Sequence, residues 1–227
     1  MKIRCEYYAG PELKFLANLD MMHMMERALR RAEIPYALSE GFNPHIKLSM
    51  GTVLPVGLWG QNEYFDLELA KRVAPEWFVM QLNAVLPPYI RVKQAREIDS
   101  HEPALMKTIN AACYAFIIQG VPLTEIIQRM EHLMQKPNLE VKSRGKKKDV
   151  VKDLKAGIYK IEVKGQEDSV IINLTVAIGE PVNIRFDELK DLLLEAGIEE
   201  RNITDIYRQA NYVKIMEDYM TPLEKVI

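Results

Sequence analysis

Side chains that can hold an anion or a nucleotide are concentrated in residues 18–69. Arg27, Arg30 and Arg31 lie in a stretch of strong helix formers, and their spacing places Arg27 on one face with both of the others. A guanidinium group matches the geometry of phosphate oxygens. The alternative is a solvated helix face whose arginines pair with glutamates of the same helix.

A second group of polar side chains follows in the segment Gly41–Lys47. Asn43 precedes a proline, which favours an extended backbone and leaves the amide free to bond. His45 can donate or accept a proton near neutral pH, and Lys47 adds a charge. No serine or cysteine nucleophile with a second base is evident nearby, so we predict recognition here, with catalysis by His45 as the alternative.

The methionines around His23 resemble a soft-metal site, but a helix distributes them around more than half of its circumference. Soft-metal sites need converging ligands, whereas methionine commonly fills irregular cores. We therefore predict packing and no metal site. The residues concerned are Met21, Met22, Met24 and Met25.

A basic run occupies the second half of the chain. Between residues 139 and 164 there are nine Lys and Arg against four Asp and Glu, although the whole chain carries a net charge of -2. Local patches rather than net charge decide where a polyanion docks. We predict a loop over residues 142–155 that contacts phosphates through Arg144, Lys146, Lys147 and Lys148; a solvated loop is the alternative.

Composition excludes several classes of protein. With 48% hydrophobic and 27% charged residues, the chain can bury a core and is not disordered. Cys5 and Cys113 are too few for a disulfide framework or an iron–sulfur cluster, and we expect buried free thiols. The sequence contains no phosphate-binding glycine loop, dinucleotide fingerprint or zinc spacing. We expect no cofactor and a cytoplasmic location.

The order of expected elements repeats. Strand, helix, two strands, helix and strand occupy residues 1–100, and a similar order occupies 108–227 after a polar break at Asp99–Pro103. This predicts an α+β fold of two tandem ferredoxin-like (βαββαβ) modules with antiparallel sheets. Asn18 is a candidate N-cap of the first helix. One large α+β domain is the alternative.

Five short motifs together resemble the radical-SAM-linked protein family, a bacterial domain of unknown function. They are Leu19-Asp20, Glu26–Ala32, Gly41–His45, Leu54–Gly57 and Glu63-Tyr64. Members of that family are fused to a radical SAM protein or encoded beside one, which implies a radical SAM partner. The family usually has histidine where this chain has Asn18, and this departure weakens any catalytic scheme that uses two histidines.

These observations lead to three hypotheses. The first is an RNA-binding accessory protein, not itself an enzyme, that presents tRNA or rRNA to a separate radical SAM enzyme. The second is a metal-independent RNA-processing endonuclease, and the third is an adaptor that binds only the radical SAM partner. The predicted RNA contacts are Arg27, Arg30, Arg31, Asn43, His45, Lys47, Arg144, Lys146, Lys147 and Lys148.

Overall fold

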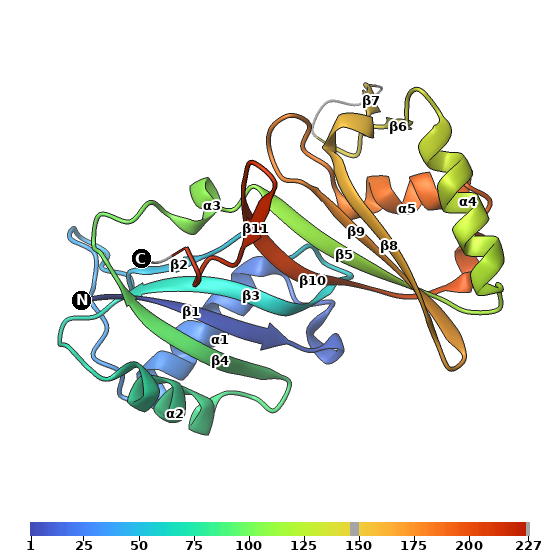
Figure 1. The fold of residues 1–227 in the computed structure, drawn as a ribbon. Coiled ribbons are helices and arrows are strands. Elements are labelled where there is room, and N and C mark those ends of the chain that lie inside the picture. Colours follow the sequence, from blue (N-terminus) through green and yellow to red (C-terminus); the bar gives the residue numbers. More distant parts are fainter. Residues whose placement is uncertain (146–149, 226–227) are drawn as a thin grey trace. The chain divides into compact units, whose positions relative to one another are not determined.

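A computed structural model describes residues 1–145 and 150–225, and the chain divides into two compact units (Figure 1). Unit 1 comprises residues 1–109 and 210–227, and unit 2 comprises residues 110–209. The segment from Ala210 onward thus belongs with the first unit, whereas the repeated order of elements in the sequence predicts it in the second module.

Unit 1 is built around a sheet in the order β4-β1-β3-β10, with β2 paired to β3 and β11 paired to β10. Strand β1 pairs antiparallel with both β3 and β4. The predicted α+β class and antiparallel pairing are confirmed. The elements are β1 (Lys2–Ala9), η1 (Pro11–Leu13), α1 (Asn18–Arg31), β2 (Leu48–Met50), β3 (Trp59–Glu68), α2 (Pro75–Val85), β4 (Ile90–Ile98), α3 (Leu105–Thr108), the last six residues of β10 (Ile203–Ile215) and β11 (Asp218–Met220).

Helix α1 owes its position to its apolar stripe. Its buried residues recur at i, i+3, i+4, i+7 and i+8, which is the spacing that places side chains on one face. They pack with α2 against β1 and β3 in one core. Ala17 rather than Asn18 is the N-cap, with no side-chain cap bond. The buried residues are Met21, Met24, Met25, Ala28 and Leu29.

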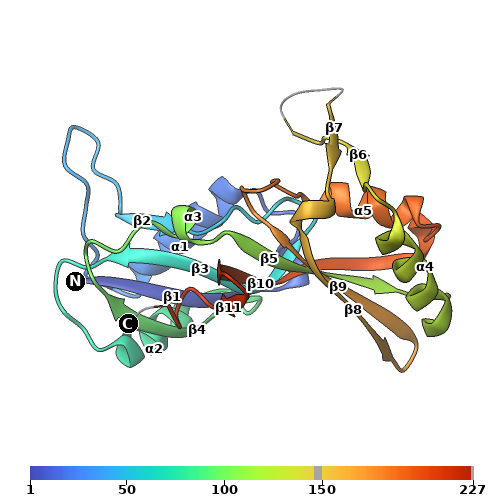
Figure 2. The same cartoon turned by 45° about the horizontal axis from the view of Figure 1, so that its top comes forward.

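Unit 2 repeats this kind of sheet in the order β10-β5-β9-β8, and β6 and β7 form a separate antiparallel pair. Strand β9 pairs antiparallel with both β5 and β8. Figure 2 shows β6 and β7 standing apart from this larger sheet. The elements are β5 (Ala111–Ile118), α4 (Leu123–Gln135), β6 (Glu140–Lys142), β7 (Val151–Asp153), η2 (Lys155–Gly157), β8 (Ile158–Gln166), β9 (Ser169–Ala177), α5 (Phe186–Glu195), η3 (Glu200–Asn202) and the start of β10.

Both cysteines are buried free thiols in the sheets. Burial raises the pKa of the Cys5 thiol well above its usual value, and the nearby Asp66 carboxylate adds to this effect. Burial likewise raises the pKa of Cys113. The reactive species is the thiolate, so both thiols are protected twice, by their position and by their protonation.

We therefore expect neither thiol of the native protein to react with a disulfide reagent at pH 7.5 within minutes. Both should react at once in denaturant. The variants Cys5→Ser and Cys113→Ser each retain one thiol, so labelling them separately shows which cysteine reacts. Rapid labelling of Cys5 in the native protein would contradict its burial.

Candidate nucleic-acid interface

The segment from Ser39 to His45 is a closed loop. Leu38 and Ile46 form a bridge at its base, and the Ser39 N–H donates to the His45 carbonyl at 2.8 Å. The Ser39 hydroxyl lies 2.8 Å from His45 Nδ1 and accepts the His45 N–H at 3.1 Å. Three bonds between these two residues hold the ends of the loop together.

The tip of this loop presents an aromatic ring to solvent. Gly41 has φ +122°, a backbone conformation that side chains rarely adopt, and Phe42 follows with a relative exposure of 113%. Asn43 and Pro44 are also exposed. The loop that leads into β2 projects away from the sheet (Figure 2). Phe42 was within a motif singled out from the sequence, but it was not predicted as a site residue.

The Ser39–His45 pair has limited catalytic potential. A serine nucleophile needs a base that is itself oriented by a third group. In the described part of the chain, no side chain hydrogen-bonds to His45 Nε2. The pair was missed in the sequence because six residues separate its members, and it serves to close the loop.

Lys47, which follows the loop, forms an ion pair. Its ammonium group lies 2.9 Å from Glu68 Oε2, and the two side chains are 41% and 45% exposed. The hydrogen bond and charge of Glu68 raise the pKa of Lys47. A phosphate at this position would have to compete with a carboxylate.

The arginines of α1 differ in whether their side chains have partners within the protein. Arg31 donates to the carbonyl of Val85 at the end of α2 at 3.1 Å, where a cation is favoured by the helix dipole. Arg27 and Arg30 are exposed. Within the described residues neither makes a side-chain hydrogen bond or ion pair. These two cations are available to an external anion.

Two described cations of the basic run in unit 2 are paired within the protein. Arg144 makes two bonds of 2.8 Å to Asp191, and this pairing raises the pKa of Arg144. Lys152 lies 2.7 Å from Glu188, which is fully buried. Lys146, Lys147 and Lys148 lie outside the described residues. The predicted phosphate contact of Arg144 would require it to leave Asp191.

Other motif residues line a small internal pocket of unit 1. Asn18 of α1 and Leu54 face it, together with Tyr7 of β1. Nearby, the Thr52 hydroxyl donates to Asn211 at 2.8 Å, and Asn211 donates to the Asn62 carbonyl at 3.0 Å. These residues of the motifs therefore contribute to packing inside unit 1. Asn211 was missed because it is 149 positions from its partner.

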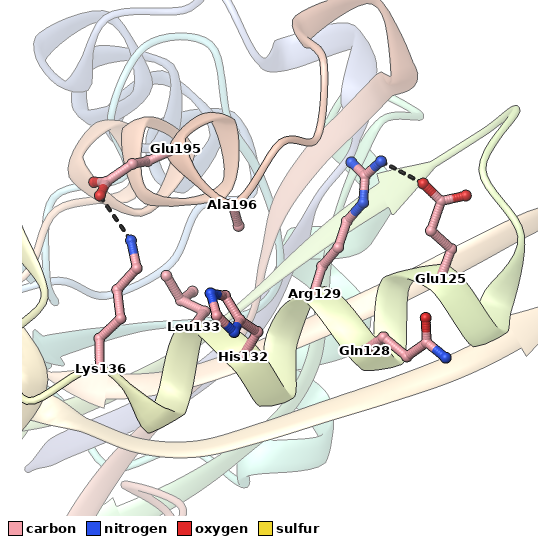
Figure 3. A pocket seen from close by; sticks show the side chains of 8 residues that line it. All are labelled: Glu125, Gln128, Arg129, His132, Leu133, Lys136, Glu195 and Ala196. Atoms are coloured by element: carbon pink, nitrogen blue, oxygen red, sulfur yellow. Dashed lines mark hydrogen bonds and ion pairs between the residues drawn. The ribbon is translucent and has the colours of Figure 1, made fainter.

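A groove of about 420 Å³ lies between α4 and α5 in unit 2 (Figure 3). Arg129 is paired with Glu125 of the same helix, and Lys136 lies 2.9 Å from Glu195 of α5. Figure 3 shows the ring of His132 between these two ion pairs. Because each of the two cations already has a carboxylate partner, the groove offers little net charge to a ligand.

The chain belongs to a bacterial family whose description reads "Uncharacterized protein conserved in bacteria (DUF2344)"; its model matches residues 2–186. No curated protein matches the sequence. No helix among the described residues is long and apolar enough to cross a membrane.

Solved structures of other proteins match the chain, and two of them are as follows. One belongs to the crystal structure of a Cbf5-Nop10-Gar1 complex, at 17% identity and a TM-score of 0.51, covering 99% of this chain and 53% of that one. The chain thus spans about half the length of that protein, and the likeness concerns the fold alone. The other is an unknown protein from Galdieria sulphuraria, at 10% identity and a TM-score of 0.26, covering 92% of this chain and 96% of that one.

Proposed function

We propose that the protein binds single-stranded RNA through the Ser39–His45 loop and presents it, as part of a tRNA or rRNA, to a separate enzyme. The observation that carries this proposal is Phe42, a fully exposed aromatic ring on a closed loop. Unpaired RNA bases stack on aromatic side chains. Closing the loop beforehand reduces the entropy that binding must overcome.

The groups around Phe42 suit the remainder of a nucleotide. Asn43 and His45 are exposed, and both can hydrogen-bond to a base edge or a ribose hydroxyl. Arg27 and Arg30 supply unpaired guanidinium groups on the same unit. Such groups bind phosphate through charge-assisted hydrogen bonds.

We propose a radical SAM enzyme as the partner, because the sequence motifs resemble those of the radical-SAM-linked protein family. The two cysteines of this chain are 108 positions apart and both are buried, so an iron–sulfur cluster would be supplied by the partner. We also propose that each unit is a ferredoxin-like module. The strand orders β4-β1-β3 with β2 beyond β3, and β10-β5-β9-β8, support this assignment.

We expect Phe42→Ala to weaken binding of a fluorescein-labelled tRNA or rRNA fragment by about 5- to 100-fold, the range typical of one base–aromatic stack. Fluorescence anisotropy at 100 mM salt measures the change. The matched control is Phe15→Ala, a second exposed phenylalanine of unit 1 at 74% exposure, which should bind within twofold of the wild type.

A salt series measures how much of the affinity phosphate contacts supply. Arg27→Gln with Arg30→Gln should lower affinity at every salt concentration and reduce the dependence of affinity on salt, since two phosphate contacts are lost. The proposal fails if Phe42→Ala binds as the wild type does, or if affinity does not change with salt.

One specific observation favours the alternative hypothesis of an adaptor that binds only the radical SAM partner. Exposed apolar side chains occur on two adjoining segments of unit 1, where the Gly57 N–H donates to the Lys14 carbonyl. They are Phe15, Leu19 and Val56, at 74%, 62% and 55% exposure, and exposed apolar patches commonly mark protein contacts. Co-purification with the radical SAM partner after ribonuclease treatment tests this hypothesis.

A further inference from the structure

We infer that one end of the unit 1 sheet, on the face opposite α1 and α2, is a second contact for single-stranded RNA, where bases stack against Tyr8 and Trp59. The inference rests on the proposed RNA-binding function but concerns a different surface from the Phe42 loop. Its residues come from the neighbouring strands β1, β3 and β4 (Figure 1).

Strand alternation places Tyr8 on this face. Ile3, Cys5, Tyr7 and Ala9 of β1 all belong to the core beneath α1 and α2. Successive side chains of a strand point to opposite faces, so Tyr8 points away from the helices. Its ring remains partly exposed.

An irregularity in the pairing of β1 and β3 brings Trp59 to the same face. Tyr7 pairs with Glu63, but Ala9 pairs with Gly60, so β3 has one extra residue here. A Cβ at Gly60 would lie 2.5 Å from the Glu63 side chain, on the core side. Trp59, the preceding residue, therefore points to the face opposite α1 and α2, and its ring centroid is 6.0 Å from that of Tyr8, with the ring planes at 70°.

Cations of β4 border the two rings. Arg91 is the register partner of Tyr8 and is exposed. Glu6 pairs with Gln94 and Tyr7 with Val92, so Lys93 is an extra residue of β4 at a second bulge. Its ammonium group lies 3.5 Å from the carboxylate of Glu6. Two adjoining aromatic rings beside the exposed Arg91 complement two bases and their connecting phosphate, whereas Lys93 would have to leave Glu6 to bind a phosphate.

Polar groups complete the surface. Gln94 donates to Glu6 at 2.8 Å, and Lys93 also donates to the side chain of Asn62. The amides of Asn62 and Gln94 can hydrogen-bond base edges, which an apolar protein-docking face cannot do. A sheet face with stacking aromatics is an established way to bind unpaired RNA, and this chemistry selects RNA over a protein partner.

Tryptophan emission tests the inference directly, because the chain has two tryptophans. Trp77 lies on α2, so Trp77→Phe leaves Trp59 as the sole reporter. A ten-nucleotide single-stranded RNA of mixed sequence should quench Trp59 emission in this variant. The converse variant, Trp59→Phe, retains Trp77 and should show no quenching.

Affinity measurements supply a second readout. Tyr8→Leu and Trp59→Leu keep apolar bulk but lose the ring, and each should weaken binding of this RNA by about 5- to 100-fold. Trp77→Leu, with a ring of 37% exposure on α2, is the matched control and should bind within twofold of the wild type. Circular dichroism establishes that each variant is folded.

The outcomes distinguish the two proposals. Quenching of Trp59 that persists in a Phe42→Ala background supports a separate surface on the sheet. Normal binding with unchanged Trp59 emission overturns this inference and leaves the Phe42 loop as the proposed contact. Absence of RNA binding by the wild type overturns both.

Discussion

Arg4→Ala is expected to lower the free energy of unfolding by about 3–5 kcal/mol. It removes the guanidinium group that binds both oxygens of a buried carboxylate and leaves that carboxylate only Lys2, at 3.6 Å. Arg4 is fully buried and Asp66 is 2% exposed. The guanidinium group binds both carboxylate oxygens, at 2.8 and 3.0 Å. It also donates to the carbonyls of Pro103 and Pro222 at 3.3 Å, so one side chain holds two distant segments on the sheet.

Urea unfolding followed by circular dichroism measures this effect. The matched control is Arg72→Ala, which breaks an ion pair with Glu97 whose side chains are 78% and 40% exposed and should cost less than about 1 kcal/mol. The double variant Arg4→Met with Asp66→Leu should recover much of the loss, because both charges of the buried pair are removed together. Equal losses in Arg4→Ala and Arg72→Ala would show that the buried pair contributes little.

Glu188→Ala is expected to destabilise unit 2 by about 3–5 kcal/mol, because this fully buried carboxylate has three partners. Glu188 accepts the N–H groups of Arg185 and Arg144, each at 3.0 Å. It also accepts from Lys152 at 2.7 Å. The Arg185 bond satisfies the start of α5, as in a capping box, whereas the other two bonds hold the β6 and β7 segments to α5.

Limited trypsin digestion distinguishes local from global loss in this variant. Cleavage between residues 140 and 155 should accelerate more than cleavage elsewhere. Glu195→Ala on the same helix is the control, because its pair with Lys136 is 51% and 36% exposed and should contribute less than about 1 kcal/mol. Cleavage spread evenly over the chain would mean that Glu188 does not anchor these strands specifically.

The two proposed RNA contacts of unit 1 differ in how they are held. Phe42 stands on a loop closed by hydrogen bonds between Ser39 and His45, whereas Tyr8 and Trp59 stand on paired strands. In both cases the backbone is fixed before a ligand arrives, which reduces the entropy cost of binding.

Helix α1 was readily predictable from the sequence. Its methionines recur at helical spacing, and a helix of that pattern packs its apolar stripe inward whatever its neighbours are. The turn at Gly41–Pro44 was predictable from its residue types, although its closure by Ser39 and His45 was not. The exposure of Phe42 was not, because an aromatic residue in a turn can equally fold back onto the core.

Which charged residues are buried and which are paired with another side chain could not be derived from the sequence. Arg4 alternates with apolar residues in β1 as a solvent-facing residue would, yet it is buried beneath the segments that contain Pro103 and Pro222. Arg144 is part of a basic run, yet it pairs with Asp191, which lies 47 positions away. Such pairings depend on which strands and helices adjoin, and this information is not local.

By itself the sequence determined the α+β class and the apolar faces of the helices, because these depend on local spacing. Only the tertiary structure decided which of the predicted cations have carboxylate partners, that Ser39 and His45 close one loop, and that Tyr8 and Trp59 share a face. Each of these outcomes depends on strand register and long-range packing, where a shift of one residue reverses the face of every side chain that follows.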